Sequence, residues 1–119
     1  MEKIDLKPDP REVKSNGSKY IFLTVKVGNG DFGGNYVTLN DEFLVKGSFT
    51  NPVLLGPVEI FGGKKLRIQT NVLDNSPLDI AVITTEFKNE NGVVLFSSID
   101  QGPITAGGIV AFFGNYMII

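Results

Sequence analysis

Hydrophobic and polar residues alternate along much of this chain, most clearly between Lys65 and Leu73. Leu66, Ile68 and Val72 stand on alternate positions, and polar side chains separate them. A period of two residues is typical of a strand that buries one face and exposes the other. The pattern therefore predicts a half-buried antiparallel strand over the whole run.

Other segments rich in Val, Ile and Phe predict further strands. They span residues 20–27, 35–39, 43–49, 53–61, 78–88, 93–99 and 109–119. Clusters of Asn, Gly and Pro separate most of them at intervals of about ten residues, which is typical of a sandwich or barrel. We therefore expect an all-β chain, an antiparallel β-sandwich of jelly-roll or immunoglobulin-like type. It should have about seven to nine strands and little or no helix.

Three of these segments carry signs of their place in a sheet. Residues 78–88 include a stretch that is apolar on both faces, Ile80–Ile83, which predicts a central strand. Pro57 cannot donate a backbone hydrogen bond, so residues 53–61 are expected at a sheet edge. Residues 109–119 have no polar end, and we expect a buried final strand that belongs to the monomer or also to a subunit contact.

The first part of the chain is different in character. Residues 1–19 are polar and charged, and Pro8 and Pro10 favour extended backbone there. We predict an N-terminal arm over residues 1–19 and a single β-sandwich domain over residues 20–119. A chain of 119 residues with 42% hydrophobic residues is long enough to build one core.

Composition narrows the chemistry, because the chain has no His, no Cys and no Trp. The commonest general base and the thiol nucleophile are therefore absent, and no disulfide can form. Glu59 and Glu86 lie in predicted strands and remain as acid–base candidates, although a glycosidase needs two such groups across one cleft. We expect a protein that is not an enzyme and has no cofactor.

Charge and hydropathy narrow the partners and the location. The net charge is −2 and the isoelectric point is near 5.0, so general nucleic-acid binding is disfavoured. No apolar run is long enough for membrane insertion. The start of the chain has no signal peptide pattern. We expect a protein that is cytoplasmic as encoded, or released or particle-associated without such a signal.

Glycine-rich loops supply the candidate binding residues. Gly28–Gly33 matches the pattern G-x-G-x-x-G, but a predicted strand follows it where a dinucleotide site needs a helix, so we interpret it as a hairpin loop. Phe32, Tyr36 and Tyr116 lie in or beside such loops. Exposed aromatic residues often anchor partners, and these three are our binding candidates. The alternative is that their rings fold back over the end of the sandwich.

Calcium is the metal that the composition disfavours least, because it takes oxygen ligands only. Asp31, Asp74 and Asp79 are weak calcium candidates in two loops. Their spacing fits no EF-hand, and acidic residues in turns usually accept hydrogen bonds from nearby backbone. We therefore expect no metal.

A resemblance bears on assembly. Phe112-Phe113-Gly114 and the apolar strand after it resemble the closing strand of trimeric jelly rolls of the tumour-necrosis-factor and C1q type, which implies oligomerisation. We expect a non-catalytic binding or assembly module that associates with itself or binds a protein or glycan partner through loops and the C-terminal strand. The alternatives are a structural subunit of a virion, tail or surface fibre, and a carboxylate-dependent hydrolase.

Overall fold

The structure, a computed structural model, describes residues 2–119. Over these residues the chain forms ten strands and one short 3-10 helix. In chain order they are β1 (Glu2–Asp5), β2 (Arg11–Val13), β3 (Tyr20–Val27), β4 (Phe32–Leu39), β5 (Glu42–Gly47), β6 (Val53–Pro57), η1 (Val58–Ile60), β7 (Leu66–Leu73), β8 (Ile80–Lys88), β9 (Val94–Pro103) and β10 (Ile109–Ile118). The prediction of an all-β fold is confirmed. The strands beyond the predicted number are β1 and β2.

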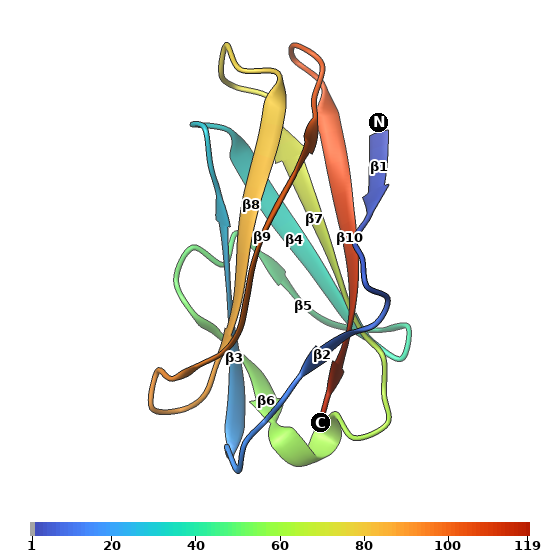
Figure 1. The fold of residues 1–119 in the computed structure, drawn as a ribbon, viewed down its shortest axis with the longest axis vertical. Helices are drawn as coiled ribbons and strands as arrows, with labels where there is room; N and C mark the ends of the chain where they lie inside the picture. The colour runs from blue at the N-terminus through green and yellow to red at the C-terminus, as the bar shows by residue number, and fades with distance from the viewer. Residues whose placement is uncertain (1) are drawn as a thin grey trace.

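The strands form two sheets that pack as a β-sandwich (Figure 1). Sheet A has six strands in the order β1-β10-β7-β4-β5, with β2 on the same edge of β10 as β1. Sheet B has four strands in the order β6-β3-β8-β9. The predicted places hold, since β8 is a central strand and β6 is an edge strand. No helix over residues 2–119 has the length and apolar character to cross a bilayer.

Alternate residues of each strand fill the space between the sheets. On β7, Leu66, Ile68 and Val72 are buried, as the alternation predicts. They meet inward residues of sheet B such as Leu23 and Ile83 in two adjoining apolar clusters. Full burial of one such side chain contributes roughly 1.5–3 kcal/mol. Because one face of each strand is buried in this core, only the opposite face of the strand is open to a ligand.

The loop after β3 does not make the predicted hairpin. β3 lies in sheet B, whereas β4 lies in sheet A and pairs with β5 and β7. The chain therefore crosses from one sheet to the other through Asn29 and Gly30, which both have positive φ. Gly33 is needed at the crossing, because a Cβ atom there would collide with Val27 of β3.

Two other boundaries differ from the predictions. β6 ends at Pro57, and the 3-10 turn that follows brings Phe61 into the core, where it is almost fully buried. β9 continues to Pro103, so Gln101-Gly102-Pro103 is strand rather than turn. β8 and β9 form an antiparallel hairpin, and Gly92 in its turn has the left-handed φ of 75° that such a turn requires.

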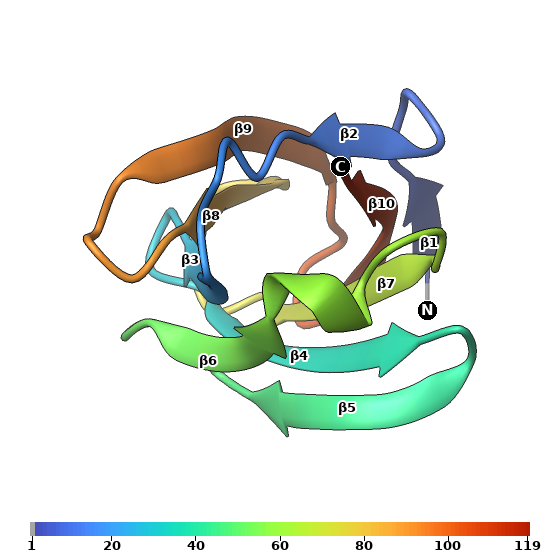
Figure 2. The same cartoon turned by 90° about the horizontal axis from the view of Figure 1, so that it is seen from below.

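The stretch that we set apart as an N-terminal arm contains part of sheet A. β1 and β2 both pair with β10, and they run parallel to it. Figure 2 looks along the sandwich and shows β2 beside β9 and β10, where the two sheets would otherwise be open. The backbone between β1 and β2 keeps Leu6 buried and its amide bonded to the carbonyl oxygen of Phe113 at 2.8 Å.

Candidate functional site

β4 places two of the predicted binding residues on the outer face of sheet A. Phe32 is 60% exposed and Tyr36 is 43% exposed. Between and beyond them, Asn35 and Val37 turn toward the core and are buried. Residues an even number of positions apart share one face of a strand, so Phe32 and Tyr36 look out on the same side.

Tyr116 does not belong to this surface. It is 1% exposed, and its ring lies 5.0 Å from that of Phe87 and 5.7 Å from that of Phe96, measured between centroids. The prediction of an exposed anchor is wrong because Gly114 and Asn115 do not form a turn. They continue β10, and Gly114 has no Cβ that would press against the Tyr116 ring. Burial raises the pKa of the Tyr116 phenol.

Strand register aligns further side chains with Tyr36. Gln69 of β7 pairs with Tyr36 on one side and with Phe113 of β10 on the other, which makes one row across three strands. In the next row Arg67 lies between Thr38 and Asn115. A hollow of about 220 Å³ lies here, and its lining residues are Tyr36, Thr38, Asp41, Arg67, Gln69 and Phe113. We call this the sheet A hollow.

Aromatic rings support both sides of the sheet A hollow. The guanidinium carbon of Arg67 lies 4.7 Å from the ring centroid of Phe113, and Lys3 Nζ lies 5.6 Å from the same centroid. On the other side the rings of Tyr36 and Phe43 have centroids 5.2 Å apart. Stacking on a ring restrains a guanidinium and keeps its planar set of donors oriented.

Polar atoms of the sheet A hollow keep hydrogen-bonding capacity. Gln69 donates through Nε2 to Asn71 Oδ1 at 3.0 Å, which leaves its amide oxygen as an acceptor. Within residues 2–119, neither the Tyr36 hydroxyl nor the Arg67 guanidinium makes a hydrogen bond to another side chain or to backbone. These groups can therefore bind a ligand without breaking a contact of the fold.

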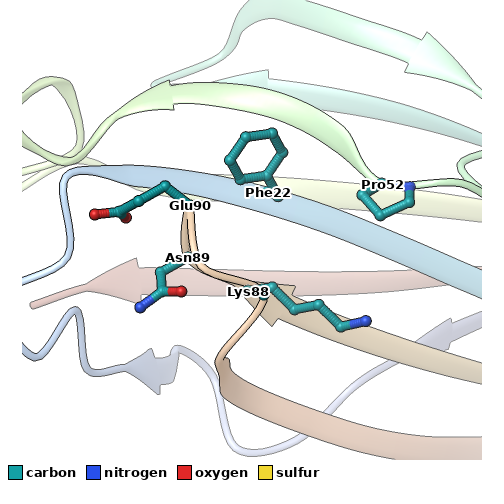
Figure 3. Close-up of a pocket in the computed structure, with 6 residues that line it drawn as sticks. Phe22, Pro52, Lys88, Asn89 and Glu90 are labelled. Atoms are coloured by element: carbon teal, nitrogen blue, oxygen red, sulfur yellow. The ribbon is translucent and has the colours of Figure 1, made fainter.

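A second hollow of about 210 Å³ lies beside the β8–β9 hairpin (Figure 3). It is lined by Phe22, Pro52, Lys88, Asn89, Glu90 and Gly92. The Glu90 carboxylate accepts hydrogen bonds from the backbone amides of Lys19 and Tyr20, and Asn89 Oδ1 accepts two within its own turn. The backbone amide of Glu90 itself lowers the pKa of the Glu90 carboxyl most, and the backbone amides of Lys19 and Tyr20 lower it further. These polar groups already hold loops in place.

An exposed apolar row lies at one end of the same outer face. Leu73 pairs with Phe32 on one side and with Ile109 on the other, and all three side chains are exposed. Sequence reasoning found Phe32 here but missed the other two. The alternation in residues 65–73 already pointed Arg67 and Gln69 outward, yet only register brings them beside Tyr36 and Phe113.

The three acidic residues that were calcium candidates accept hydrogen bonds from loop backbone. Asp31 Oδ1 accepts from the Asn75 amide at 2.9 Å, and Asp74 Oδ2 accepts from the Gly107 amide at 2.8 Å. The backbone carbonyl of Asp79 accepts from Ile104. Within residues 2–119 no group of three acidic side chains is arranged to hold a metal ion.

The two glutamates lie on different elements. Glu59 is exposed in η1 rather than in a strand, which corrects its predicted position. Glu86 lies on the outer side of β8 with its Oε1 atom 4.0 Å from Lys88 Nζ.

No family model matches this chain, and neither a curated protein nor a solved structure shows significant similarity to it.

Proposed function

We propose that this protein is a non-catalytic binding module that holds a glycan on the outer face of sheet A. The observation that carries the proposal is the sheet A hollow. It combines aromatic rings on two sides with polar groups that keep part of their hydrogen-bonding capacity. The expectation of a binding module from the sequence thus gains a specific surface and a specific ligand class.

The chemistry of a sugar fits these groups. One face of a pyranose ring presents polarised C–H bonds, which favour the electron-rich face of an aromatic ring such as that of Tyr36. Neighbouring hydroxyls both donate and accept, so they suit an amide, a carboxylate and a guanidinium that lie close together. Gln69, Asp41 and Arg67 supply these three groups in the hollow.

The dimensions suit a short stretch of a glycan chain. Tyr36 and Phe113 are separated by one intervening strand, which places them roughly 10 Å apart. The ligand would cross β7 between them and meet Gln69 and Arg67 on the way.

The charge pattern distinguishes the two outer faces. The outward residues of β4, β7 and β10 include one charged side chain, Arg67. By contrast, the outer face of sheet B carries Lys26, Glu86 and Lys88 on its two central strands. Surfaces that bind partners are generally depleted in charge and enriched in aromatic residues and Arg. This supports sheet A as the binding side.

The test is binding to a glycan array that covers neutral hexoses, N-acetylated amino sugars and uronates, followed by calorimetric titration of the best ligand. We expect Tyr36→Ala and Gln69→Ala each to weaken binding at least about tenfold, because each removes a contact at the centre of the site. Phe22→Ala is the matched control, since it changes the second hollow, and it should leave the affinity unchanged.

Two results would overturn the proposal. One is a folded wild-type protein that binds no glycan on the array. The other is binding that survives both substitutions in the sheet A hollow. Phe32→Ser separates a further case, because it alters the exposed apolar row and leaves the hollow intact. If that variant alone loses a partner, the face binds a protein through its apolar row.

A further inference from the structure

The segment of residues 2–13 closes one side of the sandwich, and we call it the closing segment. It joins sheet A only through its parallel pairing with β10. Its alternate side chains point between the sheets. Val13 is fully buried in the larger core cluster, and Leu6 is buried in the smaller one.

The closing segment lies in a groove between β9 and β10, and the shape of this groove is specific to the segment. Ile4 lies against Phe112 of β10 and against Gly102 of β9. A side chain at Gly102 would collide with the end of Ile4, so the glycine provides a socket for this one residue. The groove therefore recognises the sequence of the segment as well as its backbone.

Charge complementarity adds to this specificity. Arg11 donates from two nitrogens to the Asp100 carboxylate at 2.8 and 2.9 Å, and also to Ser98 Oγ at 2.9 Å. The side chains of Arg11 and Asp100 are only 6% and 15% exposed. The hydrogen bond to Asp100 raises the pKa of Arg11. The largely buried carboxylate of Asp100 on β9 thus selects a cation at one position of the segment.

The link between the closing segment and β3 is anchored at both ends, where Ser15 N donates to the Ile119 carbonyl oxygen and Lys19 N donates to the Glu90 carboxylate. Between these ends Ser18 Oγ accepts one side-chain hydrogen bond, from Asn89 Nδ2. Residues 14–19 include no buried side chain, and Asn16 and Gly17 have positive φ. Six residues reach at most roughly 20 Å when extended. Straightening of this link would let the closing segment leave its own groove while the rest of the sandwich keeps its strand order.

We infer that the groove between β9 and β10 also accepts the closing segment of a second copy of this chain, so that two copies exchange residues 2–13. All contacts of Ile4, Arg11 and Val13 are the same in the closed monomer and in the exchanged dimer. Only the link and the entropy of association differ between the two states. The balance therefore shifts to the dimer as protein concentration rises.

Exchange would also place two ligand faces in one assembly. Lys3 lies in the closing segment and contacts Phe113, which lines the sheet A hollow. In the exchanged dimer each hollow would receive Lys3 from the other copy. The inference itself rests on the groove and the link, and it does not depend on the glycan proposal.

The test uses the full chain, which has no natural cysteine. The ideal Cβ position at Gly102 lies 3.5 Å from Cγ1 of Ile4, so the sulfur atoms of Ile4→Cys and Gly102→Cys fall within reach of a disulfide bond. In a closed monomer this bond joins residues of one chain, whereas in an exchanged dimer it joins two chains. After equilibration at increasing concentration and oxidation, we expect a covalent dimer whose fraction rises with concentration on a non-reducing gel.

Two controls accompany this variant. Ile4→Cys alone should give no comparable dimer, which rules out random oxidation. Thr84→Cys with Ile99→Cys joins register partners of β8 and β9 and should remain within one chain. Crosslinks that stay within single chains at every concentration would overturn the inference. A failure of the Ile4–Gly102 bond to form would overturn it too, because the groove would then not hold the segment.

Discussion

Arg11 and Asp100 form the least exposed ion pair found in residues 2–119, with side chains 6% and 15% exposed, and it joins the N-terminal strands to sheet B. Loss of Arg11 would leave the Asp100 carboxylate uncompensated in the interior. We predict that Arg11→Ala lowers the free energy of unfolding by about 3–5 kcal/mol, whereas Arg11→Met combined with Asp100→Leu costs much less. Urea denaturation of the three proteins measures both values.

The exposed pair Lys88 and Glu86 provides the control for this prediction. Its closest atoms are 4.0 Å apart, and both side chains are partly exposed. Lys88→Ala should therefore change the free energy of unfolding by less than about 1 kcal/mol. If Arg11→Ala cost no more than Lys88→Ala, the ion pair would not hold the closing segment.

Tyr116 gives the fold a dependence on alkaline pH. Burial first, and then the Asp100 charge, raise the pKa of its phenol above the usual value, against opposing effects of Arg11 and Thr85. The unfolded phenol ionises near pH 10. The un-ionised Tyr116 phenol therefore makes its full contribution to the free energy of unfolding below about pH 10. This contribution is lost as pH rises through the higher pKa of the folded state.

Tyr116→Phe tests this dependence, because it keeps the ring and removes the titrating group. We predict that between pH 8 and pH 11 the wild-type protein loses more of its free energy of unfolding than the variant does. Denaturant titrations at the two pH values provide the comparison. Equal losses in both proteins would mean that the phenol ionises without a penalty in the folded state.

At the scale of elements, alternation of hydrophobic residues located most strands but did not determine their pairing. Residues 65–73 were predictable because one face is buried and the alternation records it. Residues 78–88 were predicted from the apolar run Ile80–Ile83, in which only Ala81 and Ile83 are buried. β1 and β2 were missed as strands because few of their residues point inward, and one of these inward residues is the charged Arg11. Its burial depends on Asp100, which lies far away in the sequence.

The candidate site was predictable only in part for a related reason. Phe32 and Tyr36 were found because each lies near glycines that suggested a loop. The same reasoning misplaced Tyr116, since Gly114-Asn115 resembles a turn but continues β10. The row through Gln69 and Phe113 exists only once strand register is known, and register is a property of paired strands.

The link before β3 provides an element-scale prediction about exchange. Gly17 has φ of 76°, which proline cannot adopt. Gly17→Pro should therefore disfavour the closed turn and raise the fraction of exchanged dimer at a given concentration, as measured by light scattering. Lys14→Ala is the control within the same link, because the Lys14 side chain is exposed, and it should behave as the wild type. A Gly17→Pro variant that remains monomeric throughout would argue against this link as the hinge.

At the scale of the whole molecule, β10 connects the two proposals. One edge of this strand binds the closing segment, and its outer face supplies Phe113 to the sheet A hollow. Its inner face supplies Val110, Phe112 and Tyr116 to the core. Under the two proposals the module would carry its ligand on one broad face and exchange a strand at the adjacent edge, so each dimer would hold two ligand faces and bind repeating glycans with higher avidity.

The most direct test of glycan binding at the sheet A hollow is a two-dimensional amide NMR titration with the oligosaccharide that binds best on the array. We predict that the largest shift changes fall on β4, β7 and β10, around Tyr36, Gln69 and Phe113. Changes centred on Phe22 and Asn89, or none at saturating ligand, would contradict it.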